Sequence, residues 1–307
     1  MKTRPWKESW LAPALAALIL LSILGGALHK GWNMFKGPPE REIILQGADD
    51  SGYFYWLRSW VIDRDVDFAN DIAVTPSLDE DARRALLSRE RTDTGLVPNK
   101  YFCGWAVMTL PYYLMAHGVA HALPAVEANG VAPVYFVFIW AGQILYALCG
   151  LVIAVHLTRR FVSPPVAFAG VGLVWLCSPL VYYQGARVSM AHNLAFFLVA
   201  LVSWLTFRIH DEAEQSPHHG RFRTWILLGV CSGLLGITRP SAAVYLLFPV
   251  FMVLRLQLRS QPPSPRKMKL FLAGFAGGTA AVAIQLAAWK ALYGSFFVWS
   301  YSGEGFD

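Results

Sequence analysis

The chain is poor in charge. Asp, Glu, Lys and Arg together make up 15% of its 307 residues, whereas apolar residues make up 55%. Mean hydropathy is +0.41. This balance excludes a disordered or highly charged protein and indicates an integral membrane protein. The net charge of +6 does not indicate nucleic-acid binding, because the lysines and arginines gather at the ends of apolar runs.

Common catalytic and metal-binding motifs are also missing. The four cysteines have no metal-ligand spacing, and there is no N-x-S/T sequon, P-loop, HExxH, GxSxG or CxxC pattern. Asp63, Asp65 and Asp67 alternate as at the start of an EF-hand loop, but Phe68 and Val74 occupy its glycine and glutamate positions. This excludes an EF-hand. A divalent cation bound elsewhere among the acids of residues 30–132 stays an open alternative.

Long apolar runs dominate what is present. The first, Trp10–Leu28, carries no charge and approaches the ~20 residues that cross a bilayer. It predicts an uncleaved signal-anchor, and a signal peptide cleaved near Gly25-Gly26-Ala27 is the alternative. We expect six further spans, which makes the chain a single all-α polytopic membrane domain with seven transmembrane helices. These six are Pro133–Leu157, Pro165–Tyr183, Ala191–Phe207, Thr224–Ile237, Ala242–Leu254 and Leu270–Leu292.

The connectors alternate in charge. Basic residues gather in the segments 156–161, 208–223 and 255–269, so the positive-inside rule places these connectors and the N-terminus in the cytoplasm. Residues 30–132 then form a large first extracytoplasmic loop, which holds 14 of the 20 acids. This orientation requires that Phe102–Leu123 does not cross the membrane. We therefore expect a juxtamembrane or re-entrant segment there.

The segment 46–71 is the most informative part of that loop. Asp49 and Asp50 precede a stretch in which Tyr53, Trp56 and Trp60 recur at helical spacing and would share one face. We expect this aromatic stripe to anchor an amphipathic helix at the membrane interface. The acid pair has two interpretations. Asp50 or Ser51 caps the helix, or the carboxylates belong to a functional site.

Five short motifs together resemble the GT-C superfamily of membrane glycosyltransferases, in particular protein O-mannosyltransferases, aminoarabinose transferases and rhizobial lipopolysaccharide glycosyltransferases. In those families an acidic pair opens the first extracytoplasmic loop, a short acidic motif follows it, and later motifs include a lysine at the loop end and a Thr-Lys/Arg turn. The matching segments are Ala48–Tyr53, Asp63–Phe68, Asn99–Tyr101, Ala191–Asn193 and Gly236–Pro240. Those families usually have more than ten spans, so the C-terminal part of the usual fold is expected to be missing here.

The resemblance implies an inverting transferase in the bacterial cytoplasmic membrane. Such enzymes move a sugar from a polyprenyl-phosphate donor to a lipid, glycan or protein acceptor of the cell envelope at the outer face. Asp49 or Asp50 would be the general base, with Asp49 favoured by its position. The other site residues are Lys100, Arg187 and Arg239 for the donor phosphate, and His192, Asp63 and Asp65 for the acceptor or a metal.

Two other classes of function stay open. A lipid-carrier transporter or flippase would fit the membrane class, although the expected spans contain no acid, which argues against ion coupling. A non-catalytic membrane assembly protein would fit the short chain and would tolerate the loss of both Asp49 and Asp50. A sugar-transfer assay on the two aspartate variants separates these alternatives from an enzyme.

Overall fold

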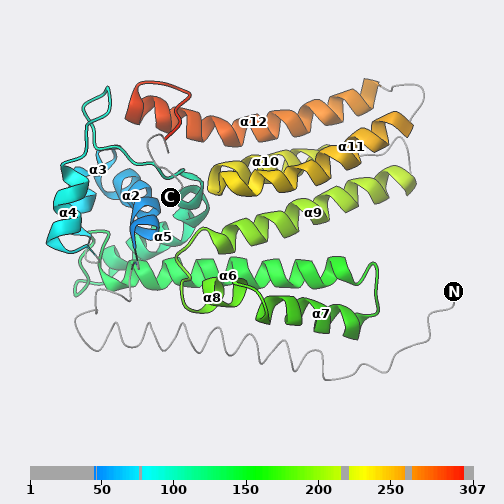
Figure 1. Cartoon of the computed structure of the whole chain (residues 1–307), viewed down its shortest axis with the longest axis horizontal. Helices are drawn as coiled ribbons and strands as arrows, with labels where there is room; N and C mark the ends of the chain where they lie inside the picture. The colour runs from blue at the N-terminus through cyan, green and yellow to red at the C-terminus, as the bar shows by residue number, and fades with distance from the viewer. Residues whose placement is uncertain (1–44, 46, 76–77, 216–220, 260–264, 301–307) are drawn as a thin grey trace, which may run out of the picture.

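The computed structural model describes residues 45, 47–75, 78–215, 221–259 and 265–300. Within these residues the regular structure is entirely helical, and no strand occurs. Long helices lie lengthwise beside one another, and a group of shorter helices covers one end of them (Figure 1). The predicted all-α class is confirmed.

The short-helix group is formed by the acidic loop. Its first helix, α2, continues directly into a π-helical turn, η1, which is followed by Arg64 in the left-handed region with φ 60°. The elements are α2 (Ala48–Arg58), η1 (Ser59–Asp63), α3 (Phe68–Val74), α4 (Glu80–Leu87) and α5 (Gly104–Ala122). Asp67 and Asp79 cap α3 and α4 by accepting backbone N–H bonds, so these two acids have a local structural role.

Three helices are long and apolar enough to cross a membrane, namely Pro133–Thr158, His192–Glu214 and Met268–Tyr293. They lie in α6 (Pro133–Thr158), α9 (His192–Gln215) and α12 (Pro265–Tyr293). The remaining apolar helices are shorter: α7 (Pro164–Leu176), α8 (Leu180–Gly185), α10 (Phe222–Thr238), and α11 (Leu247–Arg259), which follows the 3-10 turn η2 (Pro240–Leu246). The number of seven spans stays a prediction, and the expected span Trp10–Leu28 lies outside the described residues.

The run predicted as one span over 165–183 is divided in the structure. α7 ends at Leu176, and α8 begins only at Leu180, after Ser178 and Pro179. Proline lacks a backbone N–H and disfavours helix in the residue before it, which explains the break at Ser178. By contrast, α5 continues through Pro111. α5 is not among the helices long and apolar enough to cross a membrane.

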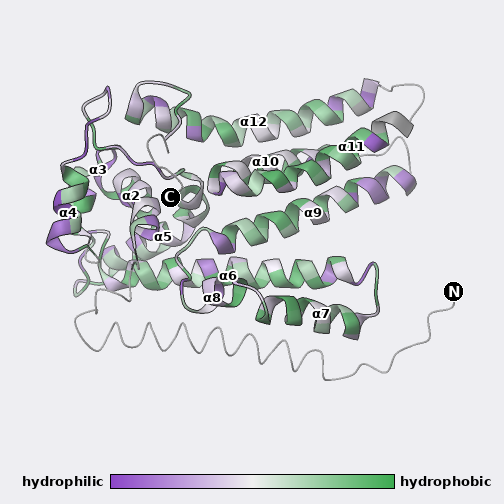
Figure 2. Cartoon of the chain, in the orientation of Figure 1, coloured by the Kyte–Doolittle hydropathy of each residue, from purple (hydrophilic) through white to green (hydrophobic). Residues whose placement is uncertain are grey.

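Hydrophilic residues gather at both ends of the long helices, and hydrophobic residues lie between them (Figure 2). The described parts of the basic connectors lie together at one end, where Arg160 donates two hydrogen bonds of 2.7 Å to Asp211 and links the ends of α6 and α9. The acidic loop lies at the other end. This separation agrees with the grouping of the connectors that the charge pattern predicts.

α2 is buried on every side rather than on one face. All nine residues from Asp50 to Arg58 are buried, and Trp56 donates a hydrogen bond from Nε1 to the carbonyl of Tyr101 over 2.8 Å. The expected interfacial anchoring by Tyr53 and Trp56 is therefore wrong. Their rings pack against other loop residues, as in the T-shaped contact of Trp56 with Phe68 at 4.8 Å.

α10 and α12 pack with their backbones in contact. A Cβ added at Gly229 would come within 1.8 Å of the Gly274 carbonyl oxygen, and one at Gly233 within 2.6 Å of the Gly278 oxygen. Close glycine contact of this kind is a common way for helices to associate in lipid. Further along α12, Gln285 accepts a hydrogen bond of 2.8 Å from the backbone N–H of Cys103.

Candidate functional site

The acid pair lies inside the first turn of α2. The N-cap is Gly47, which makes no side-chain capping bond, and the hydroxyl of Ser51 donates to the Gly47 carbonyl over 2.9 Å. The interpretation of Asp50 or Ser51 as the cap is therefore wrong. Both carboxylates lie where the positive end of the helix dipole favours an anion. Neither is used for capping, and their contacts are with distant parts of the chain.

Asp50 is fully buried and bound on both oxygens. Arg187 donates from Nη2 to Oδ1 over 2.9 Å, and the Ser189 hydroxyl donates to Oδ2. Both partners come from the connector between α8 and α9. Buried carboxylates are stable when they are paired and hydrogen-bonded in this way. Asp50 therefore fixes the connector to the start of α2.

Asp49 is half-buried and bound differently. Its Oδ1 accepts a hydrogen bond of 2.6 Å from the Tyr101 hydroxyl, whereas Oδ2 makes no hydrogen bond within the described part of the chain. The Tyr101 ring lies 5.2 Å from the ammonium nitrogen of Lys100 and packs edge-on against Tyr53. Asp49 thus combines a fixed orientation with one oxygen available to a ligand.

His192 lies where several predicted site residues meet. Its ring stacks on Tyr183 at 3.5 Å with an angle of 4°, and Nδ1 lies 3.3 Å from Nη1 of Arg239. Asp49, Arg187 and Arg239 all lie within electrostatic range of the imidazole. Because an arginine can only donate, the Arg239 contact requires an unprotonated Nδ1. The structure therefore brings together residues from α2, from the connector before α9 and from the turn after α10.

Asp63 and Asp65 do not join this cluster. Arg58 donates from Nη1 to Asp63 over 2.5 Å and to Asp71 over 2.8 Å, and the Ser59 hydroxyl donates to Asp65 over 3.0 Å. Burial raises the pKa of Asp71 to about 7, against the lowering effect of its bonds to Arg58 and Ser59. This second network stabilises the π-helical turn and α3.

Neither network forms a metal site. Among the residues that the structure describes, no group of three or more His, Cys, Asp or Glu side chains is placed to hold a metal ion. The predicted acceptor or metal role of His192, Asp63 and Asp65 therefore stays a prediction. The geometry distinguishes them, since His192 lies with the acid pair and the two aspartates do not.

Three members of the site were not predicted from the sequence. Tyr101 orients Asp49, Ser189 binds Asp50, and Tyr183 supports the His192 ring. Ser189 stands two positions after Arg187 in a short polar connector, which is a signal that could have identified it. Tyr101 closes the Asn99-Lys100-Tyr101 motif, but only the folded chain shows which carboxylate its hydroxyl reaches.

No protein-family model, curated protein or solved structure matches the chain.

Proposed function

We propose that this protein transfers a sugar from a polyprenyl-phosphate donor to a cell-envelope acceptor at the extracytoplasmic face of the membrane. The observation that carries the proposal is the meeting of Asp49, Arg187, Arg239 and His192 at the end of the helices where the acidic loop lies. His192 contacts Arg239 and lies within electrostatic range of Asp49 and Arg187, so a carboxylate for the hydroxyl nucleophile and cations for the phosphate leaving group occur in the same region.

Asp49 is the general base in this proposal. Its Oδ2 takes the proton of the acceptor hydroxyl as that oxygen attacks the anomeric carbon. The bond from the anomeric carbon to the donor phosphate oxygen breaks, and the polyprenyl phosphate leaves with the electron pair. Configuration at the sugar carbon is inverted. Tyr101, which holds Oδ1 over 2.6 Å, is a positioning residue that keeps the base oriented.

In this proposal, cationic side chains bind the phosphate of the leaving polyprenyl group. Arg239 and Lys100 bind the leaving group through charge-assisted hydrogen bonds. Arg187 is assigned to the same phosphate, and Asp50, which holds the Arg187 guanidinium, acts through it as a second positioning residue. His192, adjacent to Arg239, is assigned to the orientation of the acceptor.

The test is sugar transfer from a labelled lipid-linked donor in membranes that contain the full chain. We expect Asp49→Asn to lower the transfer rate by about 100-fold or more, because removal of a general base costs about 10²–10⁴-fold. Thermal unfolding should be nearly unchanged, since the amide keeps the Tyr101 contact. Asp81→Asn is the matched control in the same loop, because Asp81 pairs with Arg84 on the surface of α4.

Two results would contradict the proposal. Full transfer by Asp49→Asn would remove Asp49 from the reaction. Absence of transfer by the unaltered protein with every lipid-linked donor tested, together with normal membrane insertion, would favour the flippase or assembly alternatives. Tyr101→Phe adds a finer measurement, because loss of one hydrogen bond should lower the rate on the order of tenfold.

A further inference from the structure

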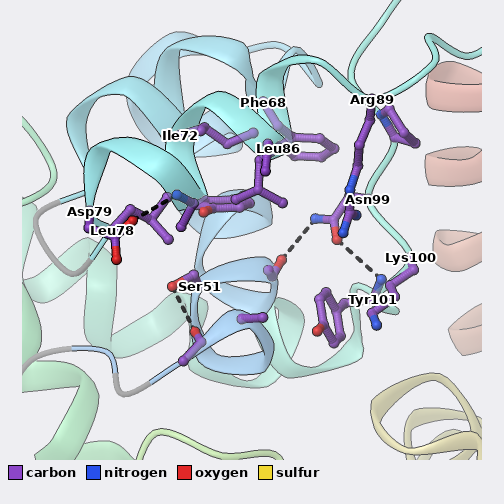
Figure 3. Close-up of a pocket in the computed structure, with 17 residues that line it drawn as sticks. Ser51, Phe68, Ile72, Leu78, Asp79, Leu86, Arg89, Asn99, Lys100 and Tyr101 are labelled. Atoms are coloured by element: carbon purple, nitrogen blue, oxygen red, sulfur yellow. Dashed lines mark hydrogen bonds between the residues drawn. The ribbon is translucent and has the colours of Figure 1, made fainter. Parts of the chain in front are cut away.

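A separate cavity opens behind α2, between α3, α4 and the segment 98–101. Its volume is about 400 Å³, which lies within the size range of small-molecule sites. Asp49, Asp50, Arg187 and Arg239 do not line it. The walls include Phe68, Arg89, Lys100 and Tyr101, which are labelled in Figure 3, and Tyr55. This cavity is therefore distinct from the candidate site, although Lys100 and Tyr101 contribute to both.

A second cavity of about 590 Å³ lies beyond the segment 98–100, against the end of α12. The two cavities share three lining residues, Arg89, Pro98 and Lys100. We call the pair the double cleft. The wall common to both halves thus carries two cations. The second half adds one further cation and two acids, Arg91, Glu90 and Asp93.

The lining of the 400 Å³ half carries two cations, Arg89 and Lys100, but only one acid, Asp79. Its acid, Asp79, accepts the backbone N–H of Ala82 over 2.7 Å as the cap of α4. Arg89 is exposed, and its guanidinium makes no hydrogen bond or ion pair within the described part of the chain. Guanidinium groups bind phosphate through paired, charge-assisted hydrogen bonds. The shared wall is therefore suited to an anion.

The inner part of the same cavity holds a polar group without a partner. Tyr55 is 5% exposed, and its hydroxyl makes no hydrogen bond among the described residues. The neighbouring hydroxyls of Ser51 and Thr75 donate their protons to the carbonyls of Gly47 and Asp71. A ligand hydroxyl that bonds to Tyr55 would supply a hydrogen bond that the described residues do not complete. The adjacent rings of Phe68 and Tyr101 supply flat apolar faces.

We propose that the double cleft binds a phosphorylated sugar. The phosphate contacts Arg89 and Lys100 on the shared wall, the sugar ring lies in the 400 Å³ half against the aromatic faces, and a sugar hydroxyl bonds to Tyr55. This site does not depend on the transfer reaction, because its only groups in common with the candidate site are Lys100 and the ring of Tyr101. The test therefore measures binding alone.

The test is calorimetric titration of the purified full chain in phosphatidylcholine nanodiscs with glucose 6-phosphate, glucose and inorganic phosphate. We expect glucose 6-phosphate to bind more tightly than either fragment. Arg89→Gln should weaken that binding at least about tenfold, since it removes a charge-assisted contact. Arg84→Gln is the matched control, since Arg84 pairs with Asp81 on α4 and lines neither cavity. It should leave the affinity unchanged.

A second variant tests the shape of the cleft without changing its charge. Ala85 is exposed on α4 and lines the 400 Å³ half, so Ala85→Trp should fill it and abolish binding while leaving thermal unfolding unaltered. Equal affinities for the unaltered protein and Arg89→Gln would overturn the proposal. So would inorganic phosphate binding as tightly as the sugar phosphate, or loss of binding in nanodiscs that contain phosphatidylglycerol, which would identify a lipid headgroup site.

Discussion

Arg187 reaches across 137 positions of the chain to donate a hydrogen bond of 2.9 Å to the buried Oδ1 of Asp50. The carboxylate is 0% exposed and the arginine side chain 22% exposed, so salt screens the pair weakly. This contact joins the start of α2 to the connector before α9. It therefore ties the acidic loop to the helices that it covers.

Loss of that contact should destabilise the protein. We expect Asp50→Ala to lower the free energy of unfolding by about 3 kcal/mol, because it leaves a partly buried guanidinium without this carboxylate. Thermal unfolding of the purified protein in detergent measures the change. Asp211→Ala removes the exposed pair with Arg160 and should cost no more than about 1 kcal/mol. Equal losses of unfolding free energy in the two variants would show that the Asp50 contact stabilises the protein no more than an exposed ion pair does.

Gly104 should tolerate no side chain. A Cβ there would come within 2.4 Å of the backbone of Ile237 and Thr238, directly before Arg239. We expect Gly104→Ala to lower stability by about 1–3 kcal/mol through overpacking and to reduce sugar transfer by displacing the Arg239 turn. Gly118 lies on the same helix with nothing within 4 Å of an added Cβ, so Gly118→Ala should keep both properties. Thermal unfolding and the transfer assay report the difference.

Asp71 should make stability depend on pH. Burial raises its pKa from 3.8 to about 7, so between these values the folded protein holds a proton that the unfolded chain releases. The resulting stabilisation is fully present below the unfolded value of 3.8 and is lost as the pH rises through about 7. We expect the melting temperature to fall over this window, and to fall less in Asp71→Asn. Parallel curves for the two proteins would contradict this assignment.

The orientation in the membrane has a direct test. Starting from Cys177→Ser, which removes an exposed thiol, we would introduce Ser88→Cys in the acidic loop or Arg159→Cys in a basic connector. A membrane-impermeant maleimide added to whole cells should label position 88 and not position 159. Labelling of position 159 alone would reverse the proposed topology, and with it the side on which Asp49 lies.

The sequence pattern predicted the helical class, and it singled out Asp49, Arg239 and His192 before the fold showed them near one another. Apolar runs located the long helices, since a bilayer-spanning helix needs about 20 apolar residues regardless of its neighbours. The charge pattern predicted that the basic connectors lie at one end of the helices. Pro179, which accounts for the break at Ser178-Pro179, was visible in the sequence. The run over 165–183 was nevertheless predicted as one helix, because hydropathy reports apolar content and not helix-breaking residues.

The contacts of the acid pair could not be predicted in the same way. The helical spacing of the aromatic residues predicted that α2 would be amphipathic, but tertiary packing buries it on every side. Nothing local distinguishes Asp49 from Asp50, and their difference arises from Tyr101 on one side and from Arg187 with Ser189 on the other. These partners are 52, 137 and 139 positions away, so only the folded chain assigns them.

The glycine seam between α10 and α12 opposes axial sliding of one helix along the other. A helix that slides along its axis by one turn moves about 5.4 Å. Such a piston movement of α12 would push larger side chains into the Gly229 and Gly233 contacts and would pull Gln285 away from the Cys103 backbone. Cys103 lies two positions after Tyr101, which holds Asp49, so a displacement of α12 along its axis would also disturb the support of that carboxylate.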